Sequence, residues 1–418
     1  MNIVHLSNST TTGAYSAAVK IHKILLKKGH NSILYANYAR VNHNNDSGIY
    51  IQNILKGKIL NLRDKYISPF FYKKLFYKQN NPKDIYCFYQ FKELRNNGIN
   101  KKLVNSLSNN IDILFVHWVS GFVNTWDILK VQKKTGCKVI YTMMDMAPIT
   151  GGCHYSMSCD LYETNCINCP ALTFNKKYIP FVQLKEKAIN MLKLKASLLT
   201  FSKNDITIAK KSHVKFIDYI DCILPFDVHL FTSQLCLNKS IKKDEFHILS
   251  CAYSKKNIRK GPNYFLETLI QLDRITTSTI YVHNIDLEFE FEYEFKNIKF
   301  LYFEYTNNIE ELISLYKKID ILVFTSIADS GPQMIFESLL SGVPVISFNV
   351  GYANQLIVDN WNGFIVDTFD TQQMANRIED LTNLYKKNLI DRRTISNHAL
   401  EYYNLNSFEF KLDKILNI

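Results

Sequence analysis

The feature that most constrains the fold of this chain is a repeated alternation between short apolar runs and amphipathic segments. The apolar runs are rich in β-branched residues, and most are followed by a stretch with helical periodicity. In the first unit, residues 2–6 have the pattern of a buried strand, and the apolar residues of 14–28 recur at i, i+4, i+7 and i+8. Such alternation is typical of βαβ units, and it predicts an α/β protein built on parallel sheets.

Two series of these units are separated by a polar, lysine-rich stretch at residues 237–245. A chain of 418 residues has room for two such domains. We therefore expect an N-terminal α/β domain over 1–236, a C-terminal α/β domain over 246–400, and a ligand site in a cleft between them. The remaining segment, 401–418, ends in a short amphipathic pattern without a strand.

Composition and motif content exclude several other classes of protein. Apolar residues make up 47% and charged residues 21% of the chain, which is ordinary globular usage. No apolar run approaches a membrane span, and the start turns polar too soon for a signal peptide, so we expect a cytoplasmic protein. The formal net charge of +12 favours anionic partners such as phosphorylated ligands or acidic lipid surfaces. No nucleic-acid-binding motif is present, so no nucleic-acid partner is expected.

The densest group of candidate functional residues follows the strand expected at 320–324. Asp329 lies in the next loop, Gly331 and Pro332 open a helix, and Glu337 lies eight residues after Asp329. Amide groups at a helix start can bind an anion. Two carboxylates beside such a site suit a sugar nucleotide, whose hydroxyls need acceptors and whose phosphates need donors. The alternative interpretation is that Asp329 is a simple helix cap.

Two further loops carry candidate phosphate ligands. Residues 254–261 read Ser-Lys-Lys-Asn-Ile-Arg-Lys-Gly and directly follow the strand expected at 246–251. In open α/β sheets, ligands bind beyond the carboxyl ends of strands. The turn at 7–13 ends in Gly13, which would let the backbone approach a ligand closely. The alternative for residues 254–261 is a solvated lysine-rich loop. Neither a G-x-G-x-x-G motif nor a P-loop is present, so a nicotinamide dinucleotide or P-loop site is not supported.

Together these motifs resemble those of glycosyltransferase family 4. The family's C-terminal signature is matched by Asp329 and Glu337, by Ser-Gly-Val-Pro-Val at 341–345 and by Asn-Val-Gly-Tyr at 349–352. The similarity covers nearly the whole chain. Further matches are Arg259-Lys260-Gly261, the donor diphosphate motif, and Thr12-Gly13-Ala14, the N-terminal turn.

This resemblance implies the GT-B fold, in which two Rossmann-like domains face each other across a cleft and the helix at 401–418 returns to the N-terminal domain. It implies transfer of a sugar from a nucleoside diphosphate-sugar to a hydroxyl, with retention at the anomeric carbon and without a cofactor for catalysis. The implied acceptor is a growing, lipid-linked glycan of a surface polysaccharide such as lipopolysaccharide.

The resemblance also implies roles for individual residues. Glu337 would bind the nucleotide ribose and Asp329 the donor sugar hydroxyls. Arg259 and Lys260 would neutralise the diphosphate leaving group, where charge develops. The implied donor-binding residues are Gly13, Arg259, Lys260, Gly331, Gln333, Met334, Ile335 and Glu337.

The chain departs from the family pattern at three places. Asp329 replaces the usual Glu, residues 144–146 read Met-Asp-Met where His-Asp-Met is common, and the interdomain signature is shortened at 225–227. His117, at the end of the strand expected at 112–117, is the nearest alternative contact to a substrate, and we count it with Asp329 and Glu337 as a catalytic candidate. The alternative for His117 is a hydrogen-bonded histidine at a strand end. The departures also favour a rival function, a catalytically degenerate glycosyltransferase-like binding or partner subunit.

Four of the nine cysteines are clustered with the spacing C-x5-C-x6-C-x2-C. They are Cys153, Cys159, Cys166 and Cys169. Four cysteines ending in C-x-x-C can form a tetrahedral structural zinc site. A subset of the family resembles this segment, with Gly-Gly-Cys-His-Tyr and a later Cys-x-x-Cys-Pro. The alternative is free or redox-labile thiols that pack a loop. We interpret His154 as a loop or acceptor-side residue rather than a metal ligand.

Residues 56–78 interleave lysine and arginine with aromatic residues. Basic, aromatic stretches of this kind bind anionic membrane surfaces, so we expect a peripheral protein on the inner face of the plasma membrane. The alternative is a packed helix whose lysines point into water.

Overall fold

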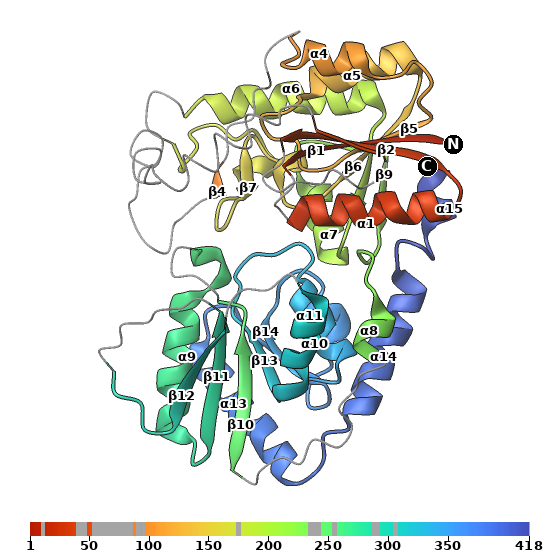
Figure 1. Cartoon of the computed structure of the whole chain (residues 1–418). Coiled ribbons are helices and arrows are strands. Elements are labelled where there is room, and N and C mark those ends of the chain that lie inside the picture. Colours follow the sequence, from red (N-terminus) through yellow and green to blue (C-terminus); the bar gives the residue numbers. More distant parts are fainter. Residues whose placement is uncertain are drawn as a thin grey trace. The chain divides into compact units, whose positions relative to one another are not determined.

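The computed structural model describes residues 1–9, 13–38, 48–51, 87–88, 93, 97–172, 177–232, 244–252, 257–285, 293–303 and 308–417. The chain forms two compact units (Figure 1). Unit 1 comprises Met1–Pro225 and Asn406–Ile418, and unit 2 comprises Phe226–Leu405. Each unit is built on one parallel sheet, as the alternation of apolar and amphipathic segments predicts.

The main sheet of unit 1 has the strand order β3-β2-β1-β5-β6-β8-β9. Its central strand, Ile113–Val116, is entirely apolar and buried, as expected where helices cover a parallel sheet on both faces. The strands are β1 (Asn2–Ser9), β2 (Asn31–Tyr38), β3 (Ile49–Ile51), β5 (Ile113–Val116), β6 (Lys138–Thr142), β8 (Ser197–Thr200) and β9 (Asp218–Asp221), with a separate antiparallel pair, β4 (Cys87–Phe88) and β7 (Cys153–Tyr155). The helices are α1 (Gly13–Lys27), α4 (Lys101–Ser106), α5 (Thr125–Thr135), α6 (Ile179–Leu194), α7 (Lys203–Lys211) and α15 (Leu412–Leu416), with short 3-10 turns η2 (Ala147–Ile149) and η3 (Leu161–Glu163).

The sheet of unit 2 has the strand order β12-β11-β10-β13-β14-β15. The strands are β10 (Glu245–Ser250), β11 (Thr279–Ile285), β12 (Ile298–Phe303), β13 (Ile321–Phe324), β14 (Val345–Phe348) and β15 (Gly363–Val366). The helices are α8 (Val228–Thr232), α9 (Pro262–Ile275), α10 (Ile309–Lys318), α11 (Gln333–Leu340), α12 (Ala353–Leu356), α13 (Thr371–Lys386) and α14 (Arg392–Asn406), with a 3-10 turn η5 (Ile258–Lys260).

Each sheet has a point at which the strand order reverses. In unit 1 it lies between β1 and β5, and in unit 2 between β10 and β13. At such a point the connections from the two parallel strands lead to opposite sides, so the loops at their carboxyl ends diverge and leave room for a ligand. Arg259, Lys260 and Asp329 follow β10 and β13 in this way.

The boundary between the units lies earlier than the lysine-rich stretch at 237–245, of which the structure describes only 244 and 245. The reason is packing. Phe226 stacks near Phe336 and Tyr403 of unit 2, with ring centroids 5.2 and 6.4 Å apart. At the C-terminus, the Phe408 amide donates to the Ile223 carbonyl at 3.0 Å, so the last residues group with unit 1.

Candidate functional site

In unit 2, the loops that follow β10 and β13 bring together the three charged residues that the sequence singles out. Lys260 Nζ donates to Asp329 Oδ2 at 2.6 Å, and Arg259 Nη1 donates to the same oxygen at 3.1 Å. Arg259 also donates to the Ala328 carbonyl at 2.5 Å. The three charged side chains are between 13 and 16% exposed, so they form a compact, largely buried cluster that a small ligand could still reach.

The charges of this cluster favour an ionised Asp329. Burial alone would raise the pKa of Asp329, but Lys260, Arg259 and their hydrogen bonds outweigh it and hold the pKa below its ordinary value. Since the two cations outnumber the one carboxylate, the cluster keeps a net positive charge. Such a site favours an anionic ligand.

Close backbone packing holds these loops together. The Ile327 amide donates to the Arg259 carbonyl at 2.9 Å. Gly261 has a positive φ of 68°, and a Cβ there would lie 2.0 Å from the Thr325 carbonyl oxygen, so only glycine fits. Gly351 belongs to the third loop of the site, and a Cβ on it would lie 2.4 Å from Pro332 Cδ.

Helix α11 begins beside this cluster and carries Glu337. Pro332 is its N-cap residue, and no side chain caps the helix start. Backbone amides there can therefore serve an anion. Gly331, Gln333, Met334 and Ile335 lie at this start, as the resemblance implies. Glu337 is 9% exposed, and its Oε2 accepts a hydrogen bond from the Tyr316 hydroxyl at 3.0 Å.

Tyr352 is a site residue to which the sequence analysis gives no role. Burial raises its pKa well above the ordinary value, and the nearby Glu337 and Asp329 carboxylates raise it further. The hydroxyl is buried, and among the described residues it has no hydrogen-bond partner. A buried hydroxyl between two carboxylates is a further candidate contact for a bound ligand. Its place directly after Gly351 was the only signal in the sequence.

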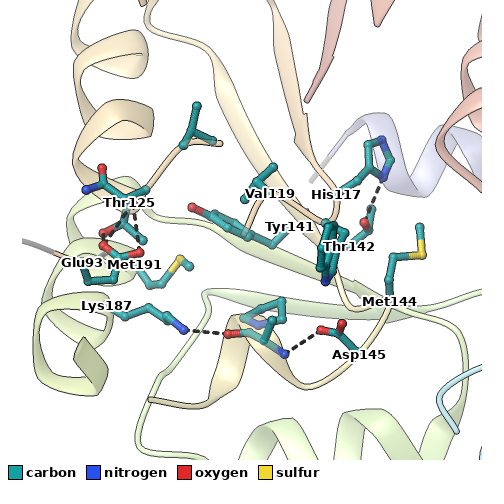
Figure 2. Close-up of a pocket in the computed structure, with 15 residues that line it drawn as sticks. Glu93, His117, Val119, Thr125, Tyr141, Thr142, Met144, Asp145, Lys187 and Met191 are labelled. Carbon is teal, nitrogen blue, oxygen red and sulfur yellow. Dashed lines mark hydrogen bonds between the residues drawn. The ribbon is translucent and has the colours of Figure 1, made fainter. Parts of the chain in front are cut away.

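Unit 1 contains a small pocket at the carboxyl ends of β5 and β6, with α6 forming one wall (Figure 2). It is lined by Glu93, His117, Trp118, Val119, Val123, Asn124, Thr125, Tyr141, Thr142, Met144, Asp145, Ala147, Pro148, Lys187 and Met191. The lining mixes an indole ring, two carboxylates and hydroxyl groups with apolar side chains. That mixture suits a ligand with both apolar faces and hydroxyl groups, as a sugar has.

His117 lines this pocket, and both of its ring nitrogens are engaged. Nε2 lies 2.9 Å from His5 Nδ1, and Nδ1 lies 2.9 Å from Thr142 Oγ1. Burial lowers the pKa of His117 to about 3, so the ring is neutral at physiological pH. This geometry fits the alternative interpretation, a hydrogen-bonded histidine at a strand end. A substrate contact by His117 stays a prediction.

The sequence analysis gives no role to Lys187 and Glu93, two buried ionisable residues that line the pocket. Lys187 is 1% exposed, and its Nζ donates to the carbonyls of Ala147 and Thr150, each at 2.6 Å. Burial lowers the pKa of Lys187 to about 8, although Glu93 opposes the shift. The one available signal was that Lys187 occupies an apolar-stripe position, three residues after Leu184 on α6.

His154 lies on β7 and contacts two residues that line the pocket, Trp118 and Asp145. Its Nδ1 lies against the Asp145 carboxylate, to which an Nδ1–H donates, and Trp118 Nε1 lies 2.8 Å from the same nitrogen. Its Nε2 lies 3.1 Å from Ser120 Oγ. His154 is therefore placed to orient two lining residues, Trp118 and Asp145.

The four clustered cysteines lie in the described part of unit 1. Cys153 and Cys169 share a small apolar cluster, and Cys166 joins the main core of the unit. Burial raises the pKa of each thiol, in Cys166 to about 11, so the thiols are protonated at neutral pH. Among the residues that the structure describes, no three His, Cys, Asp or Glu side chains are arranged to hold a metal ion. The zinc site has no preformed geometry and stays a prediction.

Other predicted features have weaker structural support or lie outside the described residues. Gly13 begins α1, but a Cβ there would meet no atom within 4 Å, so the protein itself does not require glycine at this position. Residues 10–12, 253–256 and 56–78 lie outside the described part of the chain. Among the described residues, no helix combines the length and apolar character needed to cross a bilayer.

Comparisons with known proteins agree on the class of the chain. Residues 241–399 match the family of glycosyl transferases group 1. A search of curated protein sequences found no match. Solved structures with a similar fold include sucrose-phosphate synthase from Thermosynechococcus elongatus, with 12% identity and a TM-score of 0.58 over 100% of this chain and 98% of that one.

Two further solved structures have a similar fold. HepE from Anabaena, in complex with UDP and glucose, has 14% identity and a TM-score of 0.58 over 100% of this chain and 99% of its own. The lipopolysaccharide outer core galactosyltransferase WaaB has 11% identity and a TM-score of 0.59 over 100% and 99% of the two chains. Residues 241–399 therefore match a glycosyl transferases group 1 domain, and the chain as a whole has the α/β fold of these GT-B type structures.

Proposed function

We propose that the chain transfers a sugar from a nucleoside diphosphate-sugar to a hydroxyl of a growing surface glycan carried on a lipid, with retention at the anomeric carbon. The observation that carries this proposal is the cluster of Asp329, Lys260 and Arg259 beside the uncapped start of α11. It lies in the unit that contains the family match.

The cluster suits the departure of a diphosphate. Lys260 and Arg259 would donate to the diphosphate oxygens, on which negative charge grows as the bond to the sugar breaks. Without a donor, Asp329 accepts hydrogen bonds from both cations. A bound diphosphate would take over these hydrogen bonds and leave the Asp329 carboxylate free to accept from the sugar hydroxyls. Glu337, oriented by the Tyr316 hydroxyl, would accept hydrogen bonds from the ribose. In this scheme the two side-chain cations neutralise the leaving group, and no catalytic metal is required.

The similar structures suggest which donor and acceptor to test first. HepE has been solved with UDP and with UDP-glucose, and TarM with UDP and α-GlcNAc-glycerol. WaaB by its name acts on lipopolysaccharide. A uridine diphosphate-sugar is therefore our first candidate donor, and a lipid-linked glycan our candidate acceptor.

The pocket of unit 1 is our candidate site for the acceptor sugar. The Trp118 ring offers an apolar surface for a sugar face, and Asp145 and Thr142 offer polar groups for hydroxyls. The neutral His117 and the opposed charges of Lys187 and Glu93 favour an uncharged sugar over an acidic one.

A second candidate function is a non-catalytic partner subunit. Asp329, one methylene shorter than the usual Glu, and Met144 in place of a His favour it. The retained Glu337, Arg259 and Lys260 favour the enzyme, because a subunit that binds no donor has no need of a buried cationic cluster.

The test is to replace both cations, as Arg259→Gln/Lys260→Gln, and to measure the binding of UDP and of uridine by calorimetry. Hydrogen bonds to charged groups are worth about 1.5–3 kcal/mol each, so UDP affinity should fall by about 100-fold or more. Uridine affinity should stay within about twofold, because uridine carries no diphosphate for the two cations to bind.

The matched control is Lys387→Gln/Arg393→Gln, which removes two exposed cations from the same unit. It should leave both affinities unchanged. Circular dichroism verifies that the variants are folded. Equal losses for UDP and uridine in the first variant would show that the cluster does not bind the diphosphate.

A further inference from the structure

Helices α5 and α6 of unit 1 pack against each other and expose a surface whose charges are all of one sign. Within Thr125–Thr135 and Ile179–Leu194, both fully described, the exposed charged residues are Lys133, Lys134, Lys185 and Lys193. The two carboxylates of these helices are buried: Asp127 is 1% and Glu186 9% exposed. No exposed negative charge in these helices balances the lysines.

The outer side of α6 also carries apolar residues between its lysines. Ile189 is 38% and Leu192 59% exposed, and with Lys185 they follow the spacing i, i+4, i+7 of a single helical stripe. On the inner side, Leu184 and Met191 are at most 1% exposed. The outer side of α6 therefore combines two large apolar side chains with positive charge.

Trp126 lies where the two helices meet. Its ring is partly buried against the core of unit 1, and its Nε1 is buried. Lys193 Nζ of α6 lies 5.4 Å from the centroid of this ring, which places the exposed lysine of α6 beside α5. We call this surface the α5–α6 face, and define it by Lys133, Lys185, Ile189, Leu192 and Lys193.

We propose that the α5–α6 face docks on an anionic lipid bilayer. Ile189 and Leu192 would enter the headgroup boundary, and the lysines would contact the anionic headgroups. Charge complementarity decides between a bilayer and a second copy of the chain. A twofold dimer would place this face against itself, lysine against lysine, whereas an anionic surface attracts every lysine.

The inference rests on the proposed function only for its purpose, which is to bring the enzyme to a lipid-linked acceptor. Docking itself requires neither donor nor turnover. It also assigns membrane contact to described helices that are distinct from the basic segment at 56–78.

The experiment is co-sedimentation of the full chain with vesicles of phosphatidylcholine alone and of phosphatidylcholine mixed with phosphatidylglycerol. Binding should require the anionic lipid and weaken as salt rises. Each lysine near an anionic surface contributes about fivefold in affinity, so Lys133→Gln/Lys185→Gln/Lys193→Gln should lose about 100-fold. The control Lys27→Gln/Lys28→Gln/Lys211→Gln removes the same charge from exposed positions elsewhere in unit 1 and should keep most of the binding.

The apolar part of the α5–α6 face is tested separately. Ile189→Ser/Leu192→Ser should weaken vesicle binding, whereas Leu389→Ser/Leu405→Ser should not, although the latter pair is 64 and 54% exposed. Equal losses in test and control variants, or equal binding to neutral and anionic vesicles, would overturn the proposal. So would a lipid-free dimer that Ile189→Ser/Leu192→Ser dissociates.

Binding of UDP in the absence of lipid separates this inference from the proposed function. If the α5–α6 variants lose vesicle binding but keep UDP affinity, the docking proposal is supported. If the wild-type chain binds vesicles through the α5–α6 face but binds no UDP, only the proposed function fails.

Discussion

Burial determines the charge of the ionisable side chains around the pocket of unit 1. It lowers the pKa of His117 to about 3 and that of Lys187 to about 8. Buried Glu93 has a raised pKa, and its carboxylate accepts a hydrogen bond from Thr125 Oγ1 at 2.7 Å. The pocket therefore presents a neutral imidazole and a lysine held by two backbone carbonyls. A neutral imidazole whose ring nitrogens are both engaged argues against acid–base chemistry by His117.

The buried lysine makes a prediction about pH and stability. Below about pH 8, Lys187 is protonated in the folded and unfolded chain, so its contribution to the free energy of unfolding is constant. Between about pH 8 and 10.5 the unfolded chain keeps the proton and the folded chain loses it. The free energy of unfolding of the wild type should then rise relative to Lys187→Met, by up to about 1.4 kcal/mol per pH unit.

Urea unfolding of both proteins across this pH range measures the difference directly. The comparison cancels the titration of other groups, because the two proteins share them. A free energy of unfolding of the wild type that stays constant or falls relative to that of Lys187→Met as pH rises would contradict the lowered pKa of the buried Lys187.

Secondary structure followed from local sequence patterns, and the contacts between loops did not. The strands expected at 246–251 and 320–324 are β10 and β13, each within one residue of the expected ends, because an apolar run depends on near neighbours. The Ser202 side chain likewise caps α7 by accepting from the Asp205 amide three residues on. The ion pair of Lys260 and Asp329 joins residues 69 positions apart. Only the strand order brings them together, and motif resemblance was its only sign in the sequence.

At the scale of single elements, the prediction concerns metal binding by the segment from Cys153 to Cys169. We propose that its four thiols bind one structural Zn²⁺, with thiolates replacing the buried, protonated thiols. Protein purified without added metal should contain about one zinc per chain by elemental analysis. Chelation should lower the melting temperature. Cys166→Ser/Cys169→Ser should lose the metal, whereas Cys222→Ser, which changes a buried cysteine outside the segment, should retain it.

Folded protein without zinc, or with the same zinc content in both variants, would leave free thiols as the correct interpretation of the segment. A lower melting temperature of Cys222→Ser would say nothing about zinc binding. Cys222 is 2% exposed, so its replacement changes core packing.

At the scale of the whole molecule, the two units carry different parts of the proposed reaction. Unit 2 has the family match and the donor motifs, and its site residues could be named from the sequence because their short loops follow strands in a specific pattern. Unit 1 has the pocket, whose Lys187, Glu93 and Tyr141 come from separate segments and gave little signal. The unit boundary was also missed, because the packing of Phe226 rather than local polarity determines it.

The central claim, donor turnover with retention, is tested most directly by following sugar transfer by NMR with UDP-sugars and a lipid-linked acceptor. We predict release of UDP and a product with the anomeric configuration of the donor. Glu337→Gln should lower kcat/KM by about 10- to 100-fold, since a charged hydrogen bond to the ribose is weakened. The control Glu401→Gln, at an exposed position of unit 2, should match the wild type. A product of inverted configuration, or a folded wild type that releases no nucleoside diphosphate from any donor, would contradict the account.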